Sequence, residues 1–288
     1  MAGLKWLSLS AKVRFVCTHR AFQRAPLAVL ARLLVWKVRC SLRLPATVAL
    51  FPGGPRLRLP ARWRGVAKLL YVFRKDFEPE LECLNRLLSQ GMIAVDAGAS
   101  YGAYTVTAAR ILGDSGRLLS FEPASEAYSI LVENIEINGF TRVRAIRAAL
   151  ADRPGKAPLL LHPDSSRNSL GKQEGSSGAS EDVVVATLDQ VFEQEGIDRV
   201  DFLKLDVEGA EELVLRGARS LLERWLPIVL FEVNPRATEG VGLAVSAPWD
   251  FLRQMGYDFF KVDPSSSLRR LDEPIAGGNV FAIYRAGS

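Results

Sequence analysis

The sequence predicts an α/β fold in which a mostly parallel sheet carries helices on both faces. Short apolar segments alternate along the chain with segments of helical periodicity, and this alternation favours strand–helix–strand units. The strands of this pattern are expected at 92–96, 117–121, 143–149, 200–205 and 228–233. Two final strands, at 257–262 and 279–284, have no helical pattern between them, so we expect them to pair as antiparallel strands.

The helices are predicted from apolar periodicity and from the residues that end it. Glycine is common just past a helix, and Gly91, Gly113 and Gly139 close the periodic segments 78–90, 101–112 and 125–138. Further helices are expected at 188–195, 210–222 and 249–255. Two short strands, at 157–161 and 182–186, flank a segment at 163–180 that is rich in serine and glycine. We expect that segment to be a mobile surface loop.

Charge is distributed unevenly along the chain. The formal net charge is +5, but residues 1–75 hold sixteen Lys and Arg and no acid, so all 32 acids follow them. We therefore predict a basic, partly helical N-terminal extension over 1–75 and an acidic catalytic domain over 76–288. Within the extension, the spacing of apolar residues predicts a helix at 26–38. The proline- and glycine-rich segment 45–60 indicates a boundary or an irregular β-segment.

The basic extension has two main interpretations. Its helix could pack on the catalytic domain with the cations in water, or residues 1–60 could contact an anionic membrane surface. An organelle transit peptide is a third alternative. We expect no nucleic-acid partner, because aromatic residues do not interleave with the cations as a base-stacking surface requires.

The remaining composition limits the compartment and the kind of site. No run of eighteen uncharged apolar residues occurs, so we expect no membrane-spanning helix. The three cysteines are widely spaced, which argues against a disulfide framework or a zinc site and suggests a reducing compartment. We therefore expect a cytoplasmic protein, with peripheral attachment to a membrane surface as the alternative.

The first strand of the sheet ends in a loop suited to a nucleotide-like cofactor. Asp96, Gly98 and Gly102 lie between this strand and the next helix. Glycine lets the backbone approach a ligand, and the helix start offers free N–H groups. Glu122 ends the second strand, where an acid can accept both hydroxyls of a ribose. Asp152, past the third strand, could accept from an adenine amino group or could be a turn residue.

Charged residues also follow two later strands. Lys204, Asp206 and Glu208 alternate with apolar residues at the end of the strand at 200–205, and Glu232 ends the next strand. Ligands of open α/β sheets bind at the carboxyl ends of the strands, so these four residues are candidate catalytic residues. The structural alternative is that Lys204 pairs with Glu208 or Glu232 and only holds the loop in place.

These motifs together resemble the FkbM family of S-adenosylmethionine-dependent methyltransferases. The resemblance covers roughly residues 90–262 and rests on the segments Val95-Asp96-Ala97-Gly98-Ala99-Ser100-Tyr101-Gly102, Phe121-Glu122-Pro123, Asn134 with Asn138, and Lys204-Leu205-Asp206-Val207-Glu208-Gly209-Ala210-Glu211. It implies a class I (Rossmann-like) fold, that is, a seven-stranded mixed sheet whose last strand is antiparallel. It also implies methyl transfer to a hydroxyl oxygen, commonly of a sugar, a glycan or a natural product.

The same resemblance implies roles for individual residues. Asp96, Gly98, Ser100 and Gly102 would form the loop that holds the methionine part of the cofactor, and Glu122 would hold its ribose. Two positions depart from the family pattern. Ser100 stands where the family more often has Asn, and Asn234 stands where it often has His, which removes a possible base.

A hydroxyl acceptor must lose its proton to a general base or to a metal ion that lowers its pKa. Asp206, Glu208 and Glu232 could supply either, and with Asn234 they would offer an oxygen-rich set to Mg²⁺. We predict a carboxylate base and keep the divalent cation as the less favoured alternative. Two rival functions remain: a nicotinamide-dependent oxidoreductase with a similar glycine loop, and a membrane-surface binding protein that uses the basic extension.

Overall fold

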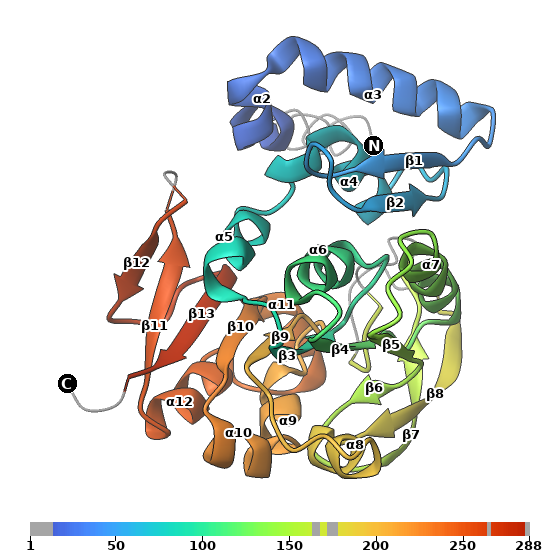
Figure 1. Ribbon diagram of the computed structural model, residues 1–288. Coiled ribbons are helices and arrows are strands. Elements are labelled where there is room, and N and C mark those ends of the chain that lie inside the picture. Colours follow the sequence, from blue (N-terminus) through green and yellow to red (C-terminus); the bar gives the residue numbers. More distant parts are fainter. Residues whose placement is uncertain (1–13, 163–167, 172–177, 264–265, 286–288) are drawn as a thin grey trace.

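A mixed sheet forms the centre of the protein (Figure 1). The computed structural model describes residues 14–162, 168–171, 178–263 and 266–285. Within these residues the sheet has eight strands in the order β12-β11-β13-β10-β9-β3-β4-β5. Its parallel centre consists of β3 (Ile93–Ala97), β4 (Arg117–Phe121), β5 (Val143–Ile146), β9 (Phe202–Leu205) and β10 (Ile228–Val233).

The last strand runs against its neighbours, as predicted. β13 (Gly278–Tyr284) lies between β10 and β11 (Tyr257–Val262) and is antiparallel to both. The expected Rossmann-like mixed sheet is therefore confirmed, with one strand more than the seven predicted. The extra strand, β12 (Leu268–Leu271), pairs with the outer edge of β11. Its sequence, Leu-Arg-Arg-Leu, has no apolar alternation, so it is recognisable only once its neighbour is known.

Helices cover both faces of the sheet and bury two separate cores. α5 (Glu80–Leu87), α6 (Ala103–Leu112) and α7 (Ser125–Glu136) contribute to the core on one face. The opposite core contains residues of α8 (Leu188–Gln194), α9 (Glu211–Arg216), α10 (Arg219–Trp225) and α12 (Ala247–Gln254). Neighbouring residues of one strand enter different cores, as Ala94 and Val95 of β3 do, because successive side chains point to opposite faces.

The helix predicted at 210–222 is divided into α9 and α10. The break occurs at Gly217, where an added Cβ would lie 2.1 Å from the carbonyl oxygen of Ala151. The carbonyl of Gly217 also accepts a hydrogen bond of 3.0 Å from the backbone of Asp189. The helix is thus interrupted at Gly217, where the backbone packs closely against Ala151 and is hydrogen-bonded to Asp189. The short helices α4 (Val66–Phe73) and α11 (Pro235–Val241) were not predicted.

The strand predicted at 143–149 ends at Ile146, and the chain then enters a second, three-stranded sheet. This sheet consists of β6 (Ala149–Leu150), β7 (Gly155–Leu160) and β8 (Ser180–Ala186), and it confirms the two short strands predicted at 157–161 and 182–186. Most of the intervening segment, expected to be a mobile loop, lies outside the described residues.

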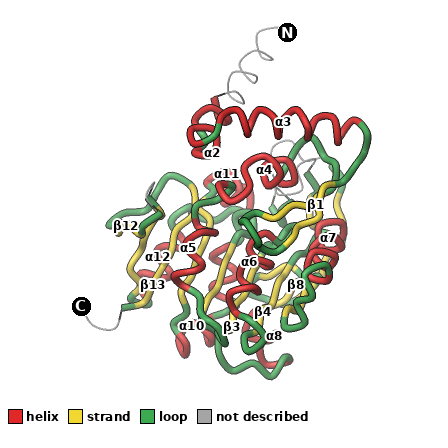
Figure 2. The backbone as a smooth tube through the Cα atoms, turned by 45° about the horizontal axis from the view of Figure 1, so that its top comes forward, coloured by secondary structure: helices red, strands yellow, loops and turns green. Residues whose placement is uncertain are grey.

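The N-terminal segment lies above the sheet as a layer of helices and a hairpin (Figures 1 and 2). α2 (Arg20–Arg24) precedes α3 (Pro26–Ser41), which confirms and extends the helix predicted at 26–38. The segment 45–60 forms an antiparallel hairpin of β1 (Ala46–Ala49) and β2 (Arg56–Leu59). α4 and the 3₁₀ turn η1 (Arg74–Asp76) connect the hairpin to the sheet domain. The division of the chain into two domains at residue 75 stays a prediction.

Asn134 of α7 and Asn138, two residues past the end of this helix, bind the N-terminal hairpin. The side chain of Asn134 accepts a hydrogen bond from the amide of Arg58 (2.6 Å) and donates to the carbonyls of Arg58 (3.2 Å) and Tyr101 (2.8 Å). Asn138 exchanges the same pair of bonds with the backbone of Arg56, both at 2.7 Å. The two side-chain amides thus form hydrogen bonds with the backbone groups at the free edge of β2. Asn134 also connects β2 to the glycine loop through its bond to Tyr101.

None of the helices in the described part of the chain combines the length and apolarity needed to cross a bilayer. Cys17, Cys40 and Cys83 are free thiols.

Candidate active site

A cavity of about 250 Å³ lies where β3, β4, β9 and β10 end. Its polar side comes from these strand ends, and its apolar side includes α4 of the N-terminal segment. The sheet supplies the lining residues Gly98, Ser100, Glu122, Lys204, Asp206, Glu208 and Glu232, and α4 supplies Val66, Leu69 and Leu70. The site is therefore built jointly by the sheet and by the segment that precedes it.

The glycine loop after β3 touches the loop after β9. Gly98 has a φ of +76°, and an added Cβ would lie 1.8 Å from the carbonyl oxygen of Asp206, so only glycine fits there. The amides of Gly98 and Ala99 donate to the carbonyl of Phe121 at 3.0 and 2.9 Å. Gly102, with a φ of +89°, begins α6 and does not line the cavity.

Glu122 is buried at the cavity and holds two backbone amides. Its Oε2 accepts from Ser100 (2.8 Å) and its Oε1 from Ala124 (2.9 Å). Burial raises the pKa of Glu122 to about 7, although these hydrogen bonds and Lys204 favour the charged form. Each carboxylate oxygen keeps acceptor capacity for a further donor, such as a ligand hydroxyl. The hydroxyl of Ser100 is buried at the cavity and has no hydrogen-bond partner among the described residues.

Lys204 is the buried centre of the charge arrangement. Its ammonium lies 3.1 Å from Asp96 Oδ1 and 3.5 Å from Asp206 Oδ2, and it donates to the carbonyl of Gly98 at 2.9 Å. Burial alone would lower the pKa of Lys204, but Asp96 and Asp206 outweigh it, so the pKa lies above its usual value. The structural alternative named other partners, Glu208 or Glu232, whereas Lys204 pairs with Asp96, directly opposite it in the β3–β9 register, and with Asp206. The loop-holding role in that alternative fits the hydrogen bond to Gly98.

Asp96 does not line the cavity, although its ion-pair partner Lys204 does. Besides the ion pair with Lys204, its Oδ2 accepts a hydrogen bond of 2.7 Å from the hydroxyl of Thr105 on α6. The side chain of Asp96 is buried. Its contacts in this structure are those of a residue that positions Lys204 and, through it, the carbonyl of Gly98.

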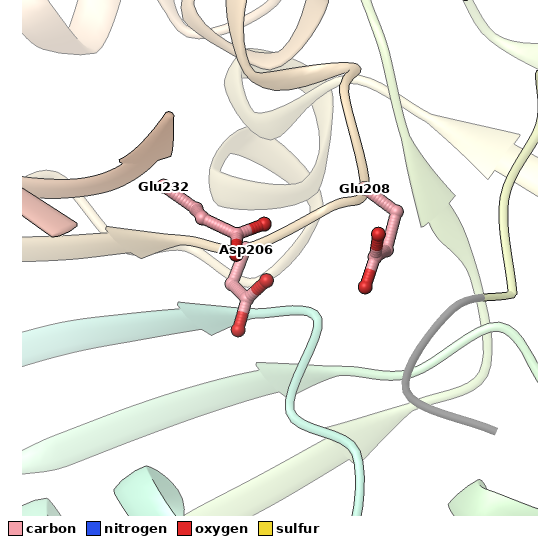
Figure 3. A group of neighbouring side chains, drawn as sticks. All are labelled: Asp206, Glu208 and Glu232. Carbon is pink, nitrogen blue, oxygen red and sulfur yellow. The ribbon is translucent and has the colours of Figure 1, made fainter. Parts of the chain in front are cut away.

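Three carboxyl groups meet at the edge of the cavity (Figure 3). Asp206 follows β9, Glu208 lies on the adjoining loop and Glu232 belongs to β10; one oxygen of each lies within 4.8 Å of the others. Asn234 donates to Glu208 (3.5 Å) and to Glu232 (3.4 Å). Such a group of oxygen atoms can accept a proton or bind a hard divalent cation. The site therefore contains the residues needed for either mechanism predicted from the sequence, a carboxylate base or a metal ion.

Glu232, one carboxyl group of this cluster, has a strongly raised pKa. Burial, followed by the charges of Asp206 and Glu208, raises the pKa of Glu232 to about 10. At neutral pH this carboxyl therefore carries a proton, which removes one of three negative charges from a small space. A group that is already protonated cannot serve as a base, so Asp206 and Glu208 are left as candidates.

The segment from Asp206 to Glu211 is held in a strained loop. Glu208 and Gly209 have φ values of +53° and +96°, and an added Cβ on Gly209 would lie 2.3 Å from the backbone of Ala237. Glu211 Oε1 accepts from the amides of Val207 (3.0 Å) and Gly209 (3.2 Å). Burial raises the pKa of Glu211 to about 7. The motif Lys-Leu-Asp-Val-Glu-Gly-Ala-Glu thus supplies one buried cation, two half-buried acids and one buried acid that anchors the loop.

Two further residues of the cavity, Tyr104 and Glu78, were not predicted from the sequence. The hydroxyl of Tyr104 donates to Glu78 Oε2 at 2.6 Å, and both side chains line the cavity. Burial, with the charge of Asp206 next, raises the pKa of Glu78 to about 8. The predicted helix at 78–90 begins only at Glu80, which leaves Glu78 in a loop where its side chain turns inward. The pattern around Phe77-Glu78-Pro79 carries no signal for this.

Most of the predicted site residues meet at one cavity, and three do not line it. Gly98, Ser100, Glu122, Lys204, Asp206, Glu208 and Glu232 line it, whereas Asp96 and Gly102 support it from outside. Asp152 is not brought to the site. Residues 148–150 line the cavity but Asp152 does not, and its carboxylate lies 3.8 Å from the guanidinium of Arg153. Here the turn interpretation of Asp152 fits the structure.

Glu232→Gln should stabilise the protein at pH 8 and do so much less at pH 5. Unfolded glutamate ionises near pH 4.3, but folded Glu232 keeps its proton to about pH 10, so stability falls as pH rises between these values. The glutamine cannot ionise and should gain about 2–4 kcal/mol at pH 8. Urea unfolding at both pH values, with exposed Glu239→Gln as the control, measures this. Equal gains at pH 5 and pH 8 would contradict a protonated Glu232.

Comparisons with known proteins agree with this geometry. Residues 96–259 match the family model described as the methyltransferase FkbM domain. Methyltransferase sdnD of Sordaria araneosa is 28% identical over 218 residues, which cover 65% of this chain and 82% of the relative. Methyltransferase 1 of Beauveria bassiana (strain ARSEF 2860) is 30% identical over 142 residues, or 43% of this chain and 57% of that relative.

Among solved structures, an FkbM methyltransferase from Methylobacillus flagellatus KT aligns with a TM-score of 0.48 and 16% identity. That alignment covers 75% of this chain and 53% of the other, so the chain spans about half the length of that protein. An O-methyltransferase from Bacillus cereus in complex with SAH aligns with a TM-score of 0.45 and 15% identity, over 94% and 99% of the two chains.

The family match covers more than half of the chain and includes Glu122 and the whole segment from Lys204 to Glu211. The glycine loop alone is compatible with a methyltransferase and with a nicotinamide-dependent oxidoreductase, and the family match favours the methyltransferase. The chain therefore belongs to the FkbM family of S-adenosylmethionine-dependent methyltransferases.

Proposed function

We propose that this chain transfers the methyl group of S-adenosylmethionine to a hydroxyl oxygen of a small-molecule or carbohydrate acceptor, such as a sugar, a glycan or a natural product. The observation that carries the proposal is the set of carboxyl groups from Asp206, Glu208 and Glu232 beside the glycine loop. Oxygen acceptors need a proton acceptor close to the reacting atom, whereas amines and thiols need one less.

The residues at the cavity fit the cofactor. Glu122 would hold the ribose hydroxyls, the loop from Gly98 to Ser100 would receive the methionine part, and the unpartnered hydroxyl of Ser100 offers a further hydrogen bond. The apolar side chains of Phe121, Ala148 and Leu150 line the cavity together with Glu122 and would pack against the adenine ring of the cofactor. When bound, the cofactor supplies a methyl group on a positively charged sulfur, and the acidic rim favours a cation at this place.

Asp206 is the proposed base of the reaction. Its side chain is 36% exposed and lines the cavity, so that an acceptor hydroxyl can reach it, while Lys204 fixes one of its oxygens. Glu232 keeps a proton at neutral pH, and the side-chain amide of Asn234 donates to both Glu232 and Glu208. On the opposite side Val66, Leu69 and Leu70 of α4 cover the cavity with apolar surface, which helps to exclude water during transfer.

Calorimetry with S-adenosylmethionine and with its demethylated product SAH tests the cofactor half of the proposal. The wild type should bind both, and Glu122→Ala should bind SAH about 10- to 100-fold more weakly, because two hydrogen bonds from the ribose to the carboxyl group are lost. Glu136→Ala, an exposed acid of α7, is the matched control and should bind as the wild type does. Absence of heat with either ligand in the folded wild type would overturn the proposal.

The acceptor atom needs a separate experiment. Methylation of a panel of sugars, glycans and hydroxylated natural products, followed by mass spectrometry and NMR of the product, should place the new methyl group on oxygen. Transfer exclusively to nitrogen, sulfur or carbon acceptors would refute the O-methyl part while leaving the cofactor assignment intact.

A further inference from the structure

α3 carries apolar side chains on two opposite faces. Its inner face buries Val29 and Trp36 against the rest of the N-terminal segment. Its outer face exposes Leu27 (81%), Leu34 (66%) and Leu42 (62%), and the same stripe includes Leu30, Val35 and Val38. An exposed apolar patch on a folded protein commonly marks a site of interaction with a partner or a membrane. In Figures 1 and 2, α3 is the outermost labelled helix of the N-terminal layer, on the side away from the sheet.

The surroundings of this outer face are positively charged. Lys37 and Arg43 are exposed on or just after α3, and neither forms an ion pair with any described residue. Residues 1–75 contain sixteen cations and no acid, so no carboxylate of this segment can neutralise them. An apolar stripe flanked by lysine and arginine is the arrangement by which helices lie in the interface of an anionic bilayer.

Charge also argues against other occupants of the face. A second copy of the chain docked through the same stripe would bring two segments of the same sign together, and that contact is repulsive. Two of the sixteen cations, both lysines, belong to residues 1–13, which contain no acid and so cannot neutralise the charge around this face.

We propose that the outer face of α3, defined by Leu27, Leu30, Leu34, Val35, Val38 and Leu42, docks this protein on the surface of an anionic phospholipid membrane. The helix would lie in the plane of the interface, with its stripe among the lipid chains and Lys37 and Arg43 at the phosphates. This placement differs from attachment by the whole basic extension, because it assigns the contact to one face of one helix.

The docked helix would be coupled rigidly to the cavity. Trp36 Nε1 donates to the carbonyl of Arg62 (3.0 Å), and Arg32 donates to the carbonyl of Val72 at the end of α4 (3.1 Å). α4 in turn lines the cavity with Val66, Leu69 and Leu70. A single helix, α4, therefore connects the membrane-facing helix α3 to the cavity. Docking would keep the cavity on the side of the sheet that faces the bilayer.

Flotation of the full chain with lipid vesicles tests the proposal. The wild type should float with vesicles of 70% phosphatidylcholine and 30% phosphatidylglycerol, only weakly with pure phosphatidylcholine, and less as salt rises. Leu34→Gln/Val38→Gln should bind at least tenfold more weakly, because two apolar side chains leave the stripe. Lys37→Gln/Arg43→Gln should lose about tenfold or more on anionic vesicles alone. Val184→Gln, at a residue of similar exposure (52%) on β8, is the matched control.

Three results would overturn the proposal. The first is a wild type that stays unbound with anionic vesicles, and the second is a Leu34→Gln/Val38→Gln variant that floats as the wild type does. The third is a wild-type dimer by light scattering that this variant converts to monomer, since the face would then belong to a second copy. Circular dichroism and SAH binding of every variant should match the wild type. Docking can therefore fail without any consequence for the proposed methyltransferase function.

Discussion

Turnover by Asp206→Asn should fall at least about a hundredfold, while SAH binding stays within a few-fold of the wild type. General-base catalysis contributes about 10²–10⁴ to a rate, and an amide cannot take a proton from the acceptor. Asparagine keeps the size of the side chain and can still accept from Lys204, 3.5 Å away in the wild type. The backbone of residue 206, whose amide donates to Ala97 at 3.1 Å, should be unaffected.

The control for this experiment is Asp114→Asn, an exposed aspartate far from the cavity, which should turn over as the wild type does. Rates are measured as single turnovers with excess enzyme, so that product release does not mask the chemical step. Full activity of Asp206→Asn would refute the role of Asp206.

A metal requirement is distinguished by the same assay. With a carboxylate base, the wild type should keep its rate after treatment with EDTA. Loss of activity that Mg²⁺ restores would instead assign Asp206, Glu208 and Glu232 to a divalent cation.

The sheet was predictable because its central strands are buried on both faces and therefore appear as short apolar runs. The residues of β9 are all buried, and its pattern is clear from Phe202 to Leu205. Features that depend on contacts between distant segments were not predictable. Gly217 interrupts a helical pattern only because Ala151 packs against it, and β12 has too few apolar residues to be recognised before β11 is in place.

The candidate site divides in the same way. Acids at the ends of neighbouring parallel strands must meet at one edge of the sheet, so the grouping of Asp206, Glu208 and Glu232 followed from the strand assignment. The partner of Lys204 did not follow, because it depends on which strand lies beside β9 and in what register. Glu78 and the apolar side of the cavity likewise depend on how the N-terminal segment folds back, which no periodicity encodes.

Lys204→Met should destabilise the protein by about 3–5 kcal/mol, because it leaves Asp96 as a buried charge without its partner. Methionine fills the volume of the lysine stem, so packing should account for little of the loss. The contribution of a cation whose pKa is raised on folding is fully present below its unfolded pKa, near 10.4. The loss should therefore be the same at pH 6 and at pH 8, unlike the effect of Glu232→Gln. Urea unfolding of Lys204→Met and of the exposed control Lys156→Met measures it.

A double variant separates the buried charge from other causes. In Lys204→Met/Asp96→Asn no ion is left unpaired at this position, so the double variant should be more stable than Lys204→Met alone. If instead the two losses add, or if Lys204→Met costs less than about 1 kcal/mol, the ion pair does not hold the glycine loop and the loop after β9 together. The expected non-additivity would show that this buried pair, which joins the motif of β3 to the motif of β9, is a structural condition for the cavity between them.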